Sequence, residues 1–340
     1  VYTEAMNQGL TPCDKRRDEY ISMEVFDKKK NEMTTWTPTN ANGSFSGDSM
    51  PLKTAFARSV NSVAVRLGQE MGIKRIISTA QAMGIKSPLD DTPSLALGSS
   101  DVNLLELTDA YCTVANNGMH HDPVLVTHIV DKDGNEVYLD RSQAEQVIPY
   151  KSAFLMQQLL QGGMKEPGGT SMSLWGYVGN FRDTDFGGKT GTSNNHSDAW
   201  FECVSPNLVV GAWVGGEYRS IHFRTGALGQ GSRTALPITG YFMNAVLSDP
   251  AFKKYRGRFR KPGDGDNITP DMYTCQSYYK AAKRDTPHRD STHTVSVEEV
   301  NLDEDGEPIA MPSGAENKSN ETKKKSEKKR KTEEINFDDL

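Results

Sequence analysis

The sequence predicts an α+β fold in which an antiparallel sheet is flanked by helices and packs against an all-helical lobe. Three observations support this prediction. Apolar residues recur with a helical period through much of residues 51–118, short apolar runs separated by turn residues follow between 187 and 214, and another helical pattern covers 236–247. Helices followed by a run of strands indicate an α+β arrangement rather than alternating βαβ units.

The N-terminal part is expected to be helical. Residues 1–8 read as the continuation of a helix that Gly9 ends. Pro51 suits the first turn of a second helix, which the triplet Ser59-Val60-Asn61 interrupts. A third helix follows that triplet, because Val63, Leu67 and Met71 recur every four residues.

Two more helices are expected before the strands begin. One runs from Ile73 to Met83 and ends at Gly84. The other opens at Asn103, with Glu106 three residues later as in a capping box, and Asn117-Gly118 closes it.

The second half contains the predicted strands. Asp133-Gly134 lies between two extended runs, 124–130 and 136–138, and indicates a hairpin. A helix over residues 152–160 is expected to end at Gly162-Gly163. The helix at 236–247 is expected to close the sheet, whose strands are predicted at residues 187–192, 199–204 and 208–214.

Composition excludes several classes of protein. The net charge of -6 is mild, so a nucleic-acid partner is not expected. No run approaches the roughly 18 apolar residues of a membrane span. The four cysteines include no C-x-x-C pair, so we expect neither a metal site nor a cofactor. Each is interpreted as a small buried or isolated residue: Cys13, Cys112, Cys203 and Cys275.

The chain is predicted to have three parts. Residues 1–255 carry the regular apolar periodicity of a folded domain. Residues 256–285 form an extension with a linker-like opening. Residues 286–340 are rich in charge and poor in apolar side chains, so we expect a disordered tail.

The strongest local motif is K-T-G, within the run from Phe186 to Thr192. Gly188-Lys189-Thr190 also resembles the end of a phosphate-binding loop. That loop requires a glycine five positions before Gly188, where this chain has Asp183, and a helix after the lysine. The phosphate-loop reading is therefore rejected.

A second motif, S-x-N, occurs at Ser59 and Asn61. Taken alone it is weak, since Asn61 or Ser62 could simply cap the helix that follows. However, S-x-N and K-T-G occur here in this order, about 130 residues apart. They are the second and third elements of a three-part signature found in enzymes that form an acyl-serine intermediate.

Residues 1–250 resemble the class A penicillin-binding proteins. The resemblance rests on four phrases: PLKTAFARSVNSVAVRLGQEMG around S-x-N, SLALGSSDVNLLELTDAYCTVANNG, GGKTGTSNNHSDAWF with LVVGAWVG, and WTPTN…GSFSG, which is typical of class A. It implies a β-lactamase/transpeptidase-like fold and a peptidoglycan D,D-transpeptidase. The family's partners would be stem peptides, the lipid-linked precursor and β-lactam antibiotics.

One departure from the family is serious. The first element of the signature, S-x-x-K, supplies the acylated serine, and no copy with the right context is present. In the family VYTEAMNQGL would follow that motif, so we expect the serine just before Val1, on the same helix. The resemblance also implies a glycosyltransferase domain and a membrane anchor further upstream, and an extracytoplasmic location.

The resemblance carries roles over to individual residues. Ser59 would relay a proton, and Asn61 would hydrogen-bond the acyl donor. Lys189 would place positive charge beside Ser59 and the substrate carboxylate. The Thr190 and Thr192 hydroxyls would hold that carboxylate, and the Thr192 backbone N–H would be half of the oxyanion hole. Gly188 and Gly191 would leave room for substrate along the strand.

Alternatives remain open. A hydrolase of the same fold (a carboxypeptidase or β-lactamase) or a non-catalytic β-lactam sensor would carry the same two motifs. Among other residues, His196 and Asp198 are interpreted as a surface turn rather than a dyad, and His120-His121 lacks a third metal ligand. Trp200 and Trp213 are expected in the core behind the sheet.

Overall fold

The computed structural model describes residues 1–27 and 31–275. All of these residues belong to one compact unit. The predicted tail at 286–340, and residues 276–285 of the predicted extension, lie outside the described residues.

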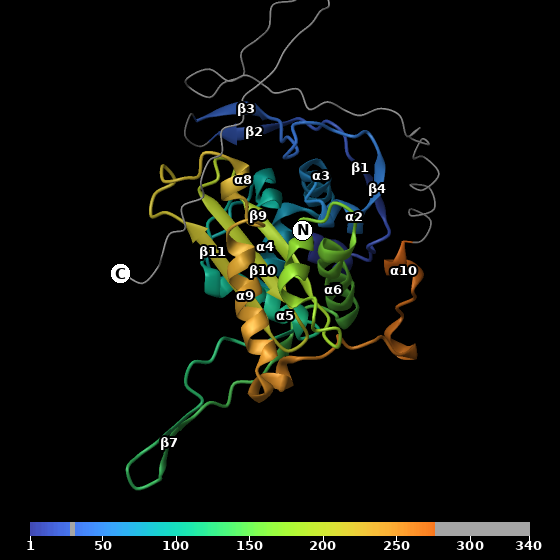
Figure 1. The fold of residues 1–340 in the computed structure, drawn as a ribbon. Coiled ribbons are helices and arrows are strands. Elements are labelled where there is room, and N and C mark those ends of the chain that lie inside the picture. The colour runs from blue at the N-terminus through green and yellow to red at the C-terminus, as the bar shows by residue number, and fades with distance from the viewer. Residues whose placement is uncertain (28–30, 276–340) are drawn as a thin grey trace, which may run out of the picture. The chain divides into compact units, whose positions relative to one another are not determined.

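The centre of the described unit is an antiparallel sheet of three strands (Figure 1). The strands are β9 (Gly187–Thr192), β10 (Asp198–Val204) and β11 (Val209–Gly215), in the order β11-β10-β9. Their positions confirm the three predicted strands within one residue at each end. The K-T-G motif therefore lies on an edge strand of this sheet.

Helix α9 (Ala235–Ser248) lies across one face of the sheet, as Figure 1 shows, and matches the predicted closing helix. Phe201 and Cys203 of β10 pack beneath it in a buried cluster with Leu236 and Met243 of α9. Two short elements border this cluster: the 3-10 helix η2 (Met172–Leu174) and α7 (Trp175–Val178).

The opposite side of the unit holds a larger core of helices. It is built around α6 (Tyr150–Lys165), with α2 (Leu52–Ala57) and α5 (Leu104–Ala115) packed beside it. The remaining helices of this lobe are α1 (Tyr2–Asn7), α3 (Asn61–Met71), α4 (Ile73–Ala82) and the 3-10 helix η1 (Pro93–Leu97). These positions confirm the helices predicted in the N-terminal half.

Helix α6 corrects one prediction. It does not end at Gly162-Gly163 but continues through both glycines to Lys165. A Cβ on Gly163 would lie 2.8 Å from the carbonyl oxygen of Gly188, and one on Gly162 would lie 3.0 Å from the Lys53 side chain. Gly163 therefore allows this helix to approach β9 closely, and Gly162 leaves room for Lys53 of α2, so neither glycine stops the helix.

The helix starts differ in part from the predicted caps. Asn103 caps α5 as expected, because its side-chain oxygen accepts from the Glu106 amide at 2.9 Å. In a capping box the Glu106 carboxylate would also accept from the backbone N–H of Asn103. Here it accepts from the backbone N–H groups of Lys86 and Ser87 instead. Neither Asn61 nor Ser62 caps α3, whose N-cap position is Val60.

The described residues also form four two-stranded sheets. They are β1 (Lys15–Arg17) with β4 (Ser49–Pro51), β2 (Met23–Asp27) with β3 (Glu32–Trp36), β5 (Met119–His120) with β8 (Glu145–Gln146), and β6 (His128–Val130) with β7 (Glu136–Leu139). The last pair is the predicted hairpin and extends away from the helices and the sheet (Figure 1). Its first strand is shorter than predicted, since residues 124–127 are not part of it.

Residues 256–275 pack against residues 1–255. This part of the chain follows α8 (Gly226–Gly229) and η3 (Pro250–Tyr255) and contains η4 (Asp264–Asp266) and α10 (Asp271–Thr274). Phe259 is buried in the helical core. The linker-like RFRKPGDGDN opening therefore lies on the folded unit, while the boundary at residue 255 stays a prediction.

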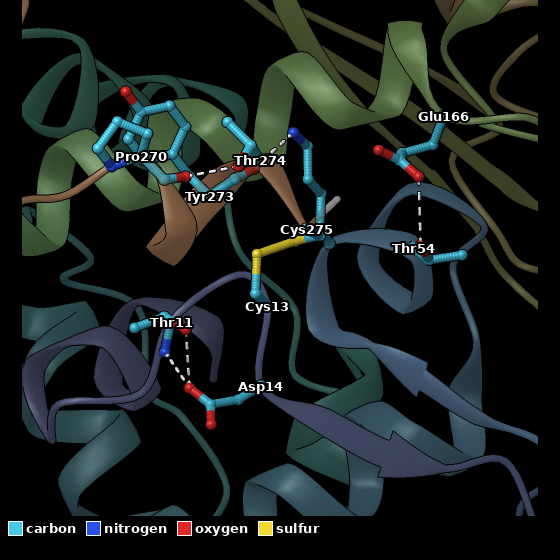
Figure 2. The surroundings of a disulfide bond; sticks show 10 residues. Thr11, Cys13, Asp14, Thr54, Glu166, Pro270, Tyr273, Thr274 and Cys275 are labelled. Carbon is cyan, nitrogen blue, oxygen red and sulfur yellow. Dashed lines mark hydrogen bonds between the residues drawn. A yellow bond between two sulfur atoms is a disulfide. The ribbon is translucent and has the colours of Figure 1, made fainter. Parts of the chain in front are cut away.

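A disulfide bond joins Cys13 to Cys275 (Figure 2). This corrects the expectation that each cysteine is isolated, because the fold brings together two positions 262 residues apart in sequence. Beside the bond, the Lys53 ammonium donates to the Tyr273 carbonyl at 3.0 Å. The other two cysteines, Cys112 and Cys203, are free. The bond fastens α10 to the loop that follows α1.

Candidate active site

Ser59 lies in the tight turn between α2 and α3. The turn closes where the Ser59 and Val60 amides donate to the Phe56 and Ala55 carbonyls, at 3.1 and 3.0 Å. Ser59 itself has a φ of 56°, in the left-handed region that residues other than glycine seldom adopt. Strained backbone of this kind persists where the surroundings impose it, and it concentrates at functional sites.

Lys189 reaches Ser59 from the edge strand. Its ammonium donates to the Ser59 hydroxyl at 2.9 Å and to the Thr190 carbonyl at 2.8 Å. The ammonium also lies 5.8 Å from the centroid of the Phe56 ring. Burial lowers the pKa of Lys189 from 10.5 to about 8, because a charged ammonium is poorly solvated there. The two motifs, 130 residues apart, thus meet through one hydrogen bond.

The S-x-N turn is held by a loop of the WTPTN phrase. The Asn61 side chain donates to the Thr39 carbonyl at 2.7 Å, and the Ser62 amide donates to the Asn40 side-chain oxygen at 3.2 Å. The side-chain amide of Asn61 is therefore already hydrogen-bonded within the protein. Any contact of its amide with a substrate would replace or share the bond to Thr39.

Buried Asp18 organises this loop. Its carboxylate accepts from the Ser62 hydroxyl at 2.6 Å, from the side-chain amide of Asn40 at 2.7 Å and from the backbone N–H of Ser46 at 2.8 Å. Burial alone would raise the pKa of Asp18, but these hydrogen bonds outweigh it and lower the pKa. Sequence reasoning missed Asp18, since no motif marks it.

The threonines of the K-T-G region face different partners. The Thr190 hydroxyl donates to the Thr170 hydroxyl at 2.8 Å. The Thr192 hydroxyl, at the exposed end of β9, accepts from the Gly231 amide at 3.1 Å. Ser59, Lys189, Thr190 and Thr170 form one connected set of hydrogen bonds, whereas Asn61 and Thr192 lie at its borders. Thr170 was missed in the sequence, although the glycine pair before it marks a close approach.

Gly188 and Gly191 have an internal packing reason. A Cβ on Gly188 would lie 2.6 Å from the Phe201 ring, and one on Gly191 would lie 3.1 Å from the Trp200 Cβ. The explanation offered from sequence, that these glycines leave room for substrate, is therefore not needed to account for them. The packing of β9 on β10 leaves no room for a side chain at Gly188 and little room for one at Gly191.

The other candidates are separate from this set. The Asp198 carboxylate accepts from the Ser197 hydroxyl and the Trp213 indole rather than bonding His196, which has a φ of 59° in its turn. His120 bonds the Asp109 carboxylate at 3.0 Å. Among the residues that the structure describes, no group of three or more His, Cys, Asp or Glu side chains could hold a metal ion.

The two tryptophans correct a prediction. Trp200 and Trp213 are paired directly across β10 and β11, with ring centroids 6.3 Å apart. Trp213 is 40% exposed, so it does not fill the core. The residues that do so are their strand neighbours Phe201 and Ala212.

A family model described as the penicillin binding protein transpeptidase domain matches residues 16–201. The chain belongs to this family. The transpeptidase domain is 31% identical over 246 residues to penicillin-binding protein 1A of Aquifex aeolicus, covering 72% of this chain and 32% of that protein. It is 29% identical over 216 residues to penicillin-binding protein 2D of Bacillus subtilis, covering 63% and 30%. It therefore spans about a third of the length of these curated relatives.

Solved structures agree with the fold of the transpeptidase domain. Penicillin-binding protein 1A from Haemophilus influenzae superposes with a TM-score of 0.65 at 26% identity, over 77% of this chain and 42% of that one. The PonA1 protein from Mycobacterium tuberculosis, in complex with penicillin V, superposes with a TM-score of 0.60 at 19% identity, over 79% and 71%. The predicted β-lactamase/transpeptidase-like fold and the resemblance to class A proteins are confirmed.

Proposed function

We propose that this domain is the acyl-transfer part of a peptidoglycan D,D-transpeptidase that works through an acyl-serine intermediate. The observation that carries the proposal is the 2.9 Å hydrogen bond between the Lys189 ammonium and the Ser59 hydroxyl. An ammonium whose pKa is lowered to about 8 by burial exchanges its proton near neutral pH. A hydroxyl beside such a group is suited to pass a proton to a leaving amine.

The nucleophile is proposed to be the serine of an S-x-x-K motif in residues that precede Val1 in a longer protein. The position of α1 supports this. Tyr2, in its first turn, packs edge-to-face on Phe56 at 5.0 Å, and the Lys189 ammonium lies 5.8 Å from the centroid of the same ring. A helical turn preceding Tyr2 would thus lie one aromatic ring away from the Ser59–Lys189 pair.

The reaction would proceed in two acyl transfers. The serine hydroxyl attacks the carbonyl between two D-alanines of a stem peptide, the peptide bond breaks, and D-alanine leaves with a proton delivered through Ser59. The amine of a neighbouring stem peptide then attacks the acyl-serine, and the serine recovers its proton. β-Lactams would acylate the same serine.

The remaining residues are proposed to bind the acyl donor. Lys189, Thr190 and Thr192 would meet its carboxylate, and charge-assisted bonds of this kind are roughly twice as strong as neutral ones. Asn61 would bond its amide, and the Thr192 backbone N–H would donate to the developing oxyanion. Gly188 and Gly191 would line the strand along which the donor lies.

The longer protein is proposed to be anchored in the cytoplasmic membrane, to act on its outer face, and to carry a glycosyltransferase that uses lipid-linked precursor. The resemblance to class A penicillin-binding proteins implies this arrangement. The Cys13–Cys275 bond supports the location, because disulfides persist in oxidising compartments outside the cytosol. Within residues 1–27 and 31–275, no helix is long and apolar enough to cross a membrane.

Labelling with a fluorescent penicillin tests the proposal. The longer protein should form an adduct that survives denaturation, and replacing the serine of its S-x-x-K motif with alanine should abolish it. The 340-residue chain should give no adduct. A denaturation-resistant adduct on the 340-residue chain would place the nucleophile within it and contradict the proposal.

A second assay separates cross-linking from hydrolysis. The longer protein is incubated with a D-Ala-D-Ala stem peptide and an excess of an amine acceptor. Incorporation of the acceptor into the product supports a transpeptidase. Release of D-alanine without incorporation at any acceptor concentration would instead identify a carboxypeptidase.

A further inference from the structure

The segment from Glu166 to Ser171 bridges the two motifs of the site. The Thr170 amide donates to the carbonyl of Ala57, the last residue of α2, at 2.9 Å. The Arg58 side chain donates to the Pro167 carbonyl at 2.9 Å. Ala57 and Arg58 directly precede Ser59 in the sequence. One side of the segment is thus bonded to the end of α2, two residues before Ser59.

The other side of the segment meets the K-T-G strand. The Thr170 hydroxyl accepts from the Thr190 hydroxyl at 2.8 Å. Thr170 therefore bonds the end of α2 through its backbone and the middle residue of K-T-G through its side chain.

The backbone around Thr170 is held in place by its own packing. Gly168 has a φ of 80°, which favours glycine, and a Cβ on Gly169 would lie 2.3 Å from the Gly163 carbonyl oxygen. At the start of the segment, Glu166 is buried and accepts from the Thr54 hydroxyl at 3.2 Å. A hydroxyl presented by such a backbone has a defined position relative to Thr190.

This position matters because of how hydroxyl groups share protons. A hydroxyl has one hydrogen to donate and lone pairs that accept. In the free site the Thr190 hydrogen is directed to Thr170. If Thr170 rotates its own hydrogen toward Thr190, the Thr190 hydrogen is released and can be donated to a carboxylate while Thr190 stays hydrogen-bonded. Without the Thr170 hydroxyl, Thr190 loses the partner that orients it.

We propose that Thr170 is a positioning residue, whose hydroxyl orients the Thr190 hydroxyl so that Thr190 can donate to the carboxylate of the acyl donor. The inference rests on the proposed function, since it takes the K-T-G strand as the carboxylate site. It assigns Thr170 no contact with the reacting atoms.

The test uses the longer protein and two substitutions. Thr170→Val removes the hydroxyl with little change of shape and keeps the backbone bond to Ala57, whereas Thr170→Ser keeps the hydroxyl. The second-order rate of acylation is measured with a penicillin that has a free carboxylate and with its methyl ester. We expect Thr170→Val to slow acylation by the free acid about five- to tenfold, the effect of one neutral hydrogen bond. Acylation by the ester should change by less than about twofold.

Two controls make the result specific. Thr170→Ser should behave like the unaltered protein toward both compounds. Thr239→Val removes the hydroxyl of a buried threonine in α9, which donates to the Leu236 carbonyl, and should leave both rates unchanged. In addition, Thr190→Val should remove the effect of Thr170→Val, because coupled residues are not additive.

The outcomes separate the inference from the function on which it rests. Equal slowing of acid and ester, or a Thr170→Ser variant as slow as Thr170→Val, would show that Thr170 only supports the fold and would overturn the inference. An unaltered longer protein that gives no penicillin adduct would contradict the proposed function itself, and the inference would fall with it.

Discussion

At the scale of single residues, the site depends on one ammonium and one strained serine. The left-handed turn at Ser59 directs its hydroxyl toward Lys189, and burial makes Lys189 a weaker base than an exposed lysine. In the proposed function the ammonium is the form that would hold a carboxylate, so its pKa would set the pH range in which the site binds an acyl donor.

Lys189→Ala in the longer protein should slow acylation by penicillin about 10- to 100-fold, the effect of losing one charge-assisted hydrogen bond. In the unaltered protein the second-order rate should fall as the pH rises through about 8, where the Lys189 ammonium loses its proton. Lys189→Arg keeps a charge that does not titrate in this range. Its profile should therefore lack this alkaline limb, and a limb that persists near pH 8 would assign the titration to another group.

The residues of the site differ in how far sequence could predict them. Ser59 and Lys189 belong to short motifs with a fixed order in the sequence. The 2.9 Å hydrogen bond between their side chains brings the two motifs together in one site, as their shared signature predicts. Asp18 bonds Ser62, the residue after S-x-N, and Thr170 bonds Thr190 of K-T-G, and both lie in segments with no signature of their own. Such partners are set by tertiary packing, which local sequence patterns do not encode.

At the scale of elements, helix α5 and strand β10 enclose a carboxyl group that the proposed reaction does not use. Glu202 is buried, accepts from the Thr108 hydroxyl at 3.3 Å, and its Oε2 has no partner within the described part of the chain. Burial raises the pKa of Glu202 to about 8, despite the opposing bond from Thr108. Its neighbours Tyr111, Cys112 and Cys203 supply no positive charge.

The fold should therefore lose stability as the pH rises. The folded state holds the Glu202 proton up to about pH 8, whereas the unfolded chain releases it near pH 4.5. Over this range the free energy of unfolding falls with pH. Glu202→Gln should match the unaltered protein near pH 5 and exceed it by roughly 3 kcal/mol near pH 8 in denaturant unfolding. Glu145→Gln, at an exposed site on β8, should show no such pH-dependent gain.

Elements were predicted best where sequence period and turn residues agreed. The three strands and the helices α3, α4, α5 and α9 follow from apolar spacing and from their flanking turns. The end of α6 was misplaced because Gly162-Gly163 has the composition of a stop signal, and only the close neighbours in the fold, Lys53 of α2 and Gly188 of β9, show why glycines occur inside that helix. Local propensity indicates which conformations a residue can adopt, and tertiary packing decides which of them occurs in the fold.

At the scale of the whole described unit, the Cys13–Cys275 bond links its beginning to its end (Figure 2). The pairing could not be predicted from sequence, because spacing alone does not specify which of four cysteines meet. The bond closes a loop of 262 residues and so restricts the unfolded chain more than a short loop would.

Removing the bond should destabilise the unit by about 2–5 kcal/mol. The measurement is thermal unfolding of the unaltered chain and of Cys275→Ser, each with and without a reductant. The unaltered chain should melt at a lower temperature when reduced, and Cys275→Ser should melt at that lower temperature in both conditions. Cys112→Ser, which removes an exposed free thiol, should keep the response to reductant. If the melting temperature of the unaltered chain is the same with and without reductant, the bond does not form.

The same bond has a consequence for the order in which the chain is made. Synthesis proceeds from the N-terminus, so Cys13 emerges 262 residues before its partner. At about 5–20 residues per second, this leaves an interval of roughly 15 to 50 s. During that interval Cys112 and Cys203 also emerge, and their thiols can pair with Cys13 before Cys275 is made. Correct pairing therefore requires either that Cys13 stay reduced until α10 and Cys275 have been made, or that an isomerase undo the early pairs by thiol–disulfide exchange.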